Sequence, residues 1–311
     1  MFNVPILMIV FKRLEATKRV FETIKQLQPK KLYISADGAR FEVNGEKEKC
    51  EEVREYILSS IDWDCEVKTL FQKENLGCGI APSSAMNWLF ENEEMGIILE
   101  DDTVPNMDFF RFCKEMLIKY KEDERFGMIG GHNAIDKENC SDTYYFSKYV
   151  QTWGWATWRR AWNGYDYGIS LWNKLKNTNF IYSIFPEKYI ADNYKHIFDQ
   201  MLDCPKDIWD YQWLFHNLVN DRKTIMPCCN LVSNIGFSSD ATHTFDENSP
   251  VSNLPHGKLS FPLKHPISFI ADNAKDRAFL DLQITKPKQK SIFYRAIRKC
   301  YRIAKKIAGV K

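Results

Sequence analysis

Three consecutive carboxylates, Glu100, Asp101 and Asp102, follow an apolar run in the stretch GIILEDDTVP. Adjacent acids repel one another, and at the end of a buried strand they are poorly solvated. A bound cation would relieve both costs, because Mg²⁺ and Mn²⁺ accept carboxylate and phosphate oxygens as ligands. The alternative is that Asp101 or Asp102 only caps the following helix. The choice between a cation site and a helix cap depends on what else lies at the same edge of the fold.

The elements that would position these acids alternate as they do in βαβ units. Apolar, β-rich runs are separated by helical patterns and cover residues 4–11, 31–36, 66–71, 96–99 and 127–131. This alternation predicts an α/β fold with a mostly parallel central sheet flanked by helices. The second half is less regular, with a helix expected over 206–220 and a strand over 231–237.

Polar residues follow each of the first three predicted strands. They are Arg13 after the first strand, Asp37 after the second, and Asn75 with Gly77 after the third. Ligands of an open parallel sheet collect at the carboxyl ends of its strands, so these groups and the three acids could together bind a nucleotide diphosphate and its metal. Each also has a plainer interpretation: Arg13 as a surface salt bridge, and the others as turn residues.

Composition places the chain among ordinary soluble globular proteins, with 44% hydrophobic and 27% charged residues. The nine cysteines are odd in number and form no CxxC pair, and no signal peptide is apparent at the start. We therefore expect reduced thiols in a cytoplasmic protein, without a disulfide framework or a zinc site. No stretch approaches the ~18–20 apolar residues that would span a bilayer.

Charge is distributed unevenly along the chain. Residues 286–311 hold ten Lys or Arg and no acid, whereas the first 285 residues carry 33 basic and 41 acidic groups, a net charge of −8. The acidic body argues against a nucleic-acid-binding protein. Apolar residues recur every three or four positions in the tail, which predicts an amphipathic helix on an anionic membrane surface at the cytoplasmic face. A solvated helix or a nucleic-acid arm are the alternatives for this segment.

Across residues 3–245 the chain resembles nucleotide-diphospho-sugar glycosyltransferases of the GT-A fold, in particular the N-acetylglucosaminyltransferase I type and its bacterial relatives, whose acidic motif is EDD. The ordered motifs are VFKRLEATKRVFETI, SADG, ENLGCG, ILEDDTVPNMDFF, TWGWATWRRAW, WDYQW and NIGFSSDATH. The resemblance implies a metal-dependent, inverting transfer from a nucleotide-sugar donor, with a UDP-sugar favoured. The acceptor would be a glycan or a lipid-linked glycan in cell-surface polysaccharide synthesis.

The resemblance also implies roles for the acids. Asp102 would contact Mn²⁺ or Mg²⁺, while Glu100 and Asp101 would orient the ribose, the sugar or the waters on the metal. His243, which follows the last expected core strand, would be a second contact to the metal or pyrophosphate, and a histidine ligand suits Mn²⁺ better than Mg²⁺. The donor nucleotide would be contacted by Arg13, Asp37, Asn75 and Gly77.

An inverting transfer needs a carboxylate that takes the proton of the attacking acceptor hydroxyl. By resemblance this base is Asp210 in the segment WDYQW, although one of the paired acids of the related motif is replaced here by Tyr211 or Gln212. Asp207 is the second choice, and it is also a natural N-cap. A wall for the acceptor or donor sugar is expected from Trp153, Gly154 and Trp155, while Trp158 and Trp162 equally suit a hydrophobic core.

The expected organisation is one GT-A domain with a tail. Residues 1–131 would form the nucleotide-sugar-binding half, residues 132–285 the acceptor-binding and catalytic half, and residues 286–311 the basic tail. Two other functions stay open. A sugar nucleotidyltransferase would normally begin with a glycine-rich phosphate loop, and VPILMIVFKRLEATK contains no glycine. A non-catalytic protein that binds sugar nucleotides would keep the fold without turnover.

Overall fold

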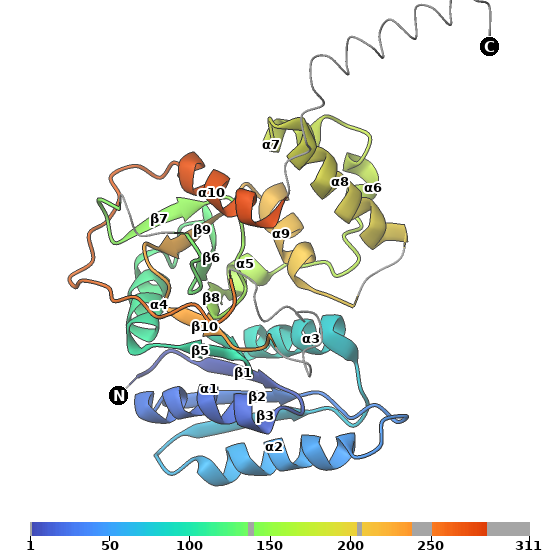
Figure 1. Ribbon diagram of the computed structural model, residues 1–311, viewed down its shortest axis with the longest axis vertical. Coiled ribbons are helices and arrows are strands. Elements are labelled where there is room, and N and C mark those ends of the chain that lie inside the picture. The colour runs from blue at the N-terminus through green and yellow to red at the C-terminus, as the bar shows by residue number, and fades with distance from the viewer. Residues whose placement is uncertain (1, 136–139, 204–206, 238–250, 285–311) are drawn as a thin grey trace, which may run out of the picture.

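The computed structural model describes residues 2–135, 140–203, 207–237 and 251–284 (Figure 1). Within these ranges one eight-stranded sheet has the order β3-β2-β1-β4-β8-β6-β9-β7, and β5 pairs with β10 in a small ribbon. The strands of the large sheet are β1 (Ile6–Val10), β2 (Lys31–Ala36), β3 (Glu66–Phe71), β4 (Met95–Glu100), β6 (Phe126–Gly130), β7 (Tyr144–Ser147), β8 (Trp155–Trp158) and β9 (Lys223–Pro227). The ribbon strands are β5 (Thr103–Pro105) and β10 (Val232–Asn234).

The N-terminal half of the sheet is parallel, as the alternating pattern predicts. β1 pairs in parallel with β2 on one side and with β4 on the other, and β2 pairs in parallel with β3. Helices α1 (Leu14–Leu27), α2 (Glu46–Ser60) and α3 (Gly77–Asn92) connect these strands. Every residue of β1 is buried, as expected for a parallel strand covered on both faces. The fold is therefore mixed α/β with a large, mostly parallel sheet flanked by helices.

β8 enters the sheet between β4 and β6 and runs antiparallel to both. Trp155 at its start pairs with Ile98, two residues before Glu100. The beginning of β8 therefore lies beside the carboxyl end of β4. This segment was expected to form a sugar wall and not a strand, and its pairing with two central strands explains why its side chains are buried.

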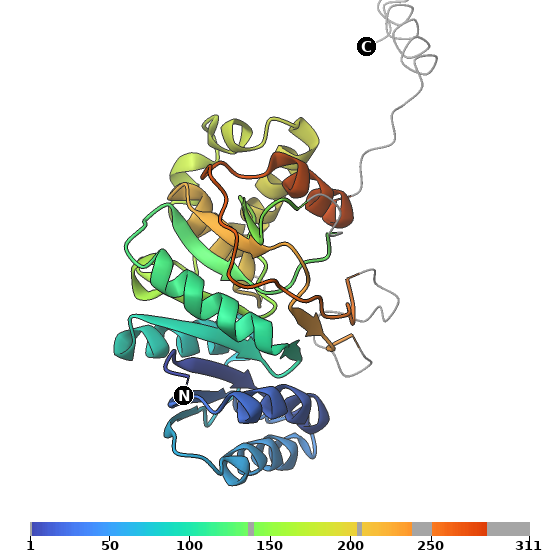
Figure 2. The same cartoon turned by 90° about the vertical axis from the view of Figure 1, so that its left-hand side faces the viewer.

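The remaining helices do not form a single layer: some pack on the strands of the sheet, and others gather at the end of the molecule opposite α2 (Figures 1 and 2). They are α4 (Met107–Lys119), α5 (Arg159–Trp162), α6 (Trp172–Leu175), α7 (Phe180–Ile184), α8 (Lys188–Asp203), α9 (Asp210–Val219) and α10 (Asn273–Gln283). Trp172, Phe198 and Phe215 hold α6, α8 and α9 together around a second hydrophobic core. The helix expected to begin near Asp207 begins at Asp210, and the strand expected over 231–237 is limited to β10.

One cysteine pair corrects the expectation of reduced thiols throughout. Cys140 and Cys228 form a disulfide with a Cα–Cα distance of 6.2 Å. The two residues are 88 positions apart, and they meet because β7 and β9 pair in antiparallel register. Such contacts depend on tertiary structure and leave no spacing signal in the sequence. The other cysteines within the described ranges form no disulfide.

Among the described residues, no helix is long and apolar enough to cross a membrane. The basic segment 286–311 lies outside the described residues, and so does His243.

Candidate functional site

Arg13 and the acids after β4 form one cluster at the carboxyl edge of the parallel strands. Nη2 of Arg13 lies 2.7 Å from Oδ2 of Asp102, and the same guanidinium also donates to both carboxylate oxygens of Asp101. Only 4% of Asp101 and 9% of Asp102 is exposed. The predicted grouping of Arg13 with the acids is confirmed, and the observed contact is a largely buried ion pair.

Positive charge is scarce in this cluster. Burial raises the pKa of Glu100 to about 8, and repulsion from Asp102 and Asp101 adds to the effect while Arg13 opposes it. Burial likewise raises the pKa of Asp102, with Arg13 again opposing. For Arg13 burial lowers the pKa, but the two aspartates raise it by more, so it stays fully protonated. One guanidinium thus faces three crowded carboxyl groups, and an additional cation would relieve their repulsion.

The donor groups fit a hard divalent cation that shares its ligands with a phosphate. Carboxylate oxygens are suitable ligands for Mg²⁺ or Mn²⁺, and such ions often take only one or two carboxylates beside substrate phosphates. Among the described residues, no group of three or more His, Cys, Asp and Glu side chains could hold a metal by itself. Within the described residues, Asp102 and its neighbours could therefore supply part of a coordination sphere for such a cation.

The β5–β10 ribbon fixes the position of Asp102. The backbone N–H of Ile235 donates to the carbonyl oxygen of Asp102 at 2.9 Å, just beyond the end of β10. Thr103 stabilises the turn formed by residues 100–103, because the backbone N–H of Glu100 donates to its Oγ1 at 2.9 Å. Any side chain at Gly236 would collide with the carboxylate of Asp102. Sequence reasoning missed Gly236, whose importance depends on this contact across more than 130 residues.

Asp37 ties the loop after β2 to the loop after β3. Its carboxylate accepts from the backbone N–H groups of Gly38 at 2.8 Å, Leu76 at 2.9 Å and Gly77 at 3.1 Å. Nδ2 of Asn75 also donates to it at 2.9 Å. Burial raises the pKa of Asp37, and the backbone donors oppose that rise. These bonds match the turn interpretation, and a contact of Asp37 with the nucleobase stays a prediction.

Asp207 caps a helix other than the predicted one. Its carboxylate accepts from the backbone N–H groups of Cys78 at 2.8 Å and Gly79 at 2.6 Å, at the first turn of α3. Gly77 has φ +83°, and a Cβ there would lie 2.5 Å from Oδ2 of Asp207. Asp207 therefore caps the N-terminus of α3 from a distant part of the same chain, which makes it a weaker candidate for the general base.

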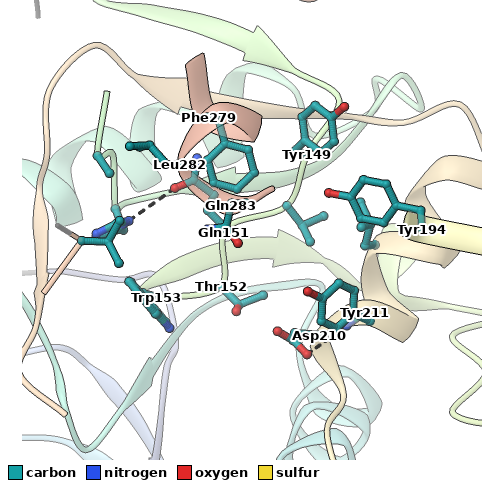
Figure 3. A pocket seen from close by; sticks show the side chains of 15 residues that line it. Tyr149, Gln151, Thr152, Trp153, Tyr194, Asp210, Tyr211, Phe279, Leu282 and Gln283 are labelled. Carbon is teal, nitrogen blue, oxygen red and sulfur yellow. Dashed lines mark hydrogen bonds between the residues drawn. The ribbon is translucent and has the colours of Figure 1, made fainter. Parts of the chain in front are cut away.

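Asp210 lies at the start of α9 and lines a pocket of about 160 Å³ (Figure 3). This acceptor-side pocket, as we name it, extends from Asp210 and Thr152 to Phe279 on α10. The charge of Asp210 contributes to the raised pKa of Glu100, so the two carboxyl groups lie within electrostatic reach. Asp210 thus connects the acid cluster to the pocket. No sequence pattern indicated that α10 would complete this pocket.

Trp153 lines the same pocket, as predicted for a wall residue. Its ring meets the imidazole of His132 edge-on at a centroid distance of 4.7 Å, and it meets Phe237 edge-on at 5.6 Å. Phe237 follows Gly236 in the chain, and Gly236 packs against the carboxylate of Asp102. Trp153 therefore contacts, through Phe237, the segment that packs against Asp102.

Gly154 and Trp155 do not face the pocket. Gly154 has φ +66°, and a Cβ there would lie 2.7 Å from Cγ2 of Val232, so glycine allows the two chains to approach closely. Trp155 has no exposed surface, and its indole stacks on Trp209 at 5.5 Å. The predicted wall is consequently reduced to Trp153. Trp158 and Trp162 are also buried, in agreement with the core interpretation.

No family model matches the chain. No curated protein matches it in sequence either. Several solved structures are similar to it in fold. HddC from Yersinia pseudotuberculosis is 12% identical with a TM-score of 0.30, covering 51% of this chain and 78% of that one. The 4-diphosphocytidyl-2C-methyl-D-erythritol synthase of Anaerococcus prevotii is 10% identical with a TM-score of 0.36, covering 72% and 88%. Mouse xyloside xylosyltransferase 1 is 10% identical with a TM-score of 0.35, covering 70% and 81%.

Proposed function

We propose that the protein is a glycosyltransferase that moves a sugar from a nucleotide-diphosphate donor, with UDP-sugars favoured, to a hydroxyl group of a glycan acceptor. One observation carries this proposal. The acid cluster with Arg13 lies at the carboxyl edge of the parallel strands, and Asp210 connects it to a neighbouring pocket. A donor site and an acceptor site joined by a carboxylate are the parts that such a transfer needs.

The donor would bind at the acid cluster. Arg13 would lie beside the diphosphate, and the loops held by Asp37 and Asn75 would approach the nucleoside. Asp102 would hold Mn²⁺ or Mg²⁺ with the phosphate oxygens, while Glu100 and Asp101 orient the ribose, the sugar or bound waters. When bound, the cation neutralises charge on the departing diphosphate. His243 as a second metal contact stays a prediction.

Asp210 would be the general base. The acceptor oxygen attacks the anomeric carbon and forms the new glycosidic bond, while the bond from that carbon to the diphosphate oxygen breaks. The hydroxyl proton moves to the carboxylate of Asp210, and the nucleoside diphosphate leaves with the electron pair. Attack opposite the leaving group inverts the anomeric configuration. The position of Asp210 between the pocket and the acids supports this assignment.

The first experiment is thermal unfolding with UDP, GDP, dTDP and their sugar conjugates, with and without Mn²⁺. A ligand at ~100 times its dissociation constant stabilises the folded state by about 2.7 kcal/mol, which is readily measured. We expect one nucleotide family to stabilise the wild type only with metal, and to fail with Asp102→Asn. Asp142→Asn, which removes a partly exposed acid outside the cluster, is the matched control. Stabilisation that ignores both metal and Asp102 would refute the donor assignment.

Turnover separates the enzyme from a non-catalytic binder. Asp210→Asn should keep nucleotide binding and lose about 10²–10⁴-fold of the sugar transfer or slow donor hydrolysis, because general base catalysis contributes that much. A wild type that binds the donor and never releases the nucleoside diphosphate would instead be a binding protein. Formation of a sugar nucleotide from a sugar phosphate and a nucleoside triphosphate would point to a nucleotidyltransferase.

A membrane-bound or lipid-linked acceptor is the second part of the proposal, and the basic residues of 286–311 support it. We expect the full chain to bind vesicles that contain anionic lipid and a truncation after Pro287 to lose this binding. Equal binding of the truncated protein would remove the membrane from the proposal and leave the transferase unaffected.

A further inference from the structure

The acceptor-side pocket differs in charge from the acid cluster beside it. The described residues that line the pocket include no Lys or Arg, and Asp210 is their single carboxylate. The acid cluster, by contrast, includes a cation, Arg13, which is ion-paired with Asp101 and Asp102. A carboxylate in a half-enclosed pocket without a cation repels an anionic guest. The pocket is therefore suited to an uncharged group.

The other lining groups are aromatic rings and neutral polar side chains. The rings include Tyr149, Trp153 and Phe279, and the polar groups include Gln151, Thr152 and Gln283 (Figure 3). Aromatic faces pack against the C–H faces of a sugar ring, and amides or hydroxyls pair with its hydroxyl groups. A pocket of about 160 Å³ is more than ten times the roughly 10–15 Å³ needed to hold one water, which is enough for a ligand about the size of a sugar ring.

His132 supplies a polar atom that the described part of the protein leaves unpaired. The residue is 3% exposed, and its Nδ1 lies 3.3 Å from Oε1 of Gln151. Its Nε2 is enclosed and has no hydrogen-bond partner among the described residues. The Val251 backbone is a weak hydrogen-bond partner of the ring, but its contact does not meet the distance and angle limits of an ordinary hydrogen bond to Nε2. A buried polar atom without a partner is costly, so a ligand that supplies one gains affinity.

Burial keeps the imidazole uncharged. It lowers the pKa of His132 to about 4, against smaller opposite effects of Gln151 and Val251. A neutral imidazole has one nitrogen that donates and one that accepts, and a sugar hydroxyl can pair with either. His132 is thus able to recognise a hydroxyl without adding charge to the pocket.

We propose that the acceptor-side pocket binds a neutral sugar of the acceptor and that Nε2 of His132 forms a hydrogen bond with one of its hydroxyl groups. The inference rests on the proposed function only in calling this sugar the acceptor. It makes His132 a specificity residue, and it excludes uronic acids and phosphorylated sugars from the position next to Asp210.

Saturation-transfer NMR with simple glycosides tests the proposal on the full chain, in the presence of UDP and the diamagnetic ion Mg²⁺. The probes are the methyl glycosides of glucose, galactose, mannose, N-acetylglucosamine and N-acetylgalactosamine. Methyl β-D-glucuronide is the anionic partner of methyl β-D-glucoside and differs from it only at carbon six. We expect at least one neutral glycoside to bind and its binding to weaken about tenfold in His132→Phe, which keeps a ring and removes both nitrogens. We expect the glucuronide to bind at least tenfold more weakly than the glucoside, if the glucoside is the one that binds.

His196→Phe is the control, because His196 is exposed on α8 and lies outside the pocket. His132→Asn, which restores a polar atom in the same place, should recover part of the binding, and the melting temperature of each variant shows whether it is folded. The proposal is overturned if no neutral glycoside binds, if anionic glycosides bind as well as neutral ones, or if folded His132→Phe binds unchanged. The nucleotide-induced thermal shift does not depend on this pocket, so loss of the donor assignment would be recognised separately.

Discussion

Replacing Asp276 by Asn should change how the stability of the protein depends on pH. Asp276 lies on α10 and is only 5% exposed. Its carboxylate accepts from Oγ of Ser147 at 2.5 Å and from the backbone N–H of Lys148 at 3.2 Å, and these bonds attach α10 to the end of β7. Because α10 contributes Phe279 to the acceptor-side pocket, this attachment also shapes the pocket.

The structure gives both the size and the sign of the effect. Burial raises the pKa of Asp276 from its usual 3.8 to about 6, with the two hydrogen bonds opposing the rise. At 1.36 kcal/mol per pH unit, this difference corresponds to a cost of about 3 kcal/mol when the group is ionised. Between pH 4 and 6 the folded protein holds a proton that the unfolded chain has released. Stability therefore falls as pH rises through this window, and the full cost is present above pH 6.

The assay is urea unfolding of the wild type and Asp276→Asn at several values between pH 4 and pH 7.5. The difference in free energy of unfolding, wild type minus variant, should fall by about 2.5 kcal/mol across this range. Asp281→Asn removes a charge from the exposed side of the same helix and controls for net charge. A difference that is flat, or that rises with pH, would refute the argument that Asp276 is ionised at a cost inside the fold.

Three further predictions concern packing and charge. Trp155→Ala should destabilise the fold by about 3–5 kcal/mol in urea unfolding, as loss of a core aromatic side chain does. Trp153→Ala should destabilise it much less. Equal losses of stability would contradict the assignment of Trp155 to the core and Trp153 to the pocket. Gly38→Ala should destabilise the fold by more than ~1 kcal/mol, because its Cβ would collide with the backbone after β3. Gly168→Ala should stay within about 0.5 kcal/mol of the wild type, because no atom lies closer than 3.4 Å to the added Cβ. Arg13→Met should destabilise the fold by about 2–4 kcal/mol, because it leaves buried carboxylates without their cation. Added Mn²⁺ should recover part of this loss. A melting temperature that changes with neither the substitution nor Mn²⁺ would contradict the claim that the cluster lacks positive charge.

The parallel half of the fold was predictable because its signals are local. Each strand is a short apolar run, and each is followed within a few residues by its polar group. Since parallel strands end at the same edge, the sequence also predicted that Arg13, Asp37, Asn75 and the acids would lie there, and the structure confirms it. The strand directions follow from the connecting helices, whose patterns the sequence displays.

The contacts that complete the site were not predictable, because they join residues far apart in the chain. Arg13 pairs with acids 88 positions away, and Asp207 caps a helix that begins 130 residues before it. Trp155 was predicted to face a ligand because the C–H faces of sugars pack on an indole, yet an antiparallel strand there buries it. The role of α10 depends on Asp276, whose partner Ser147 is 129 residues away.

The antiparallel course of β8 has a consequence for engineering and for divergence among related chains. A parallel strand would enter the sheet at the edge opposite the acids, but β8 enters next to them, and the loop that precedes it carries Gln151, Thr152 and Trp153 to the pocket. The sequence of this loop can therefore be replaced while the hydrogen bonds between β4 and β8 keep the acids in place. Changes in what the pocket binds could therefore arise by replacing about half a dozen residues, without rebuilding the acid cluster.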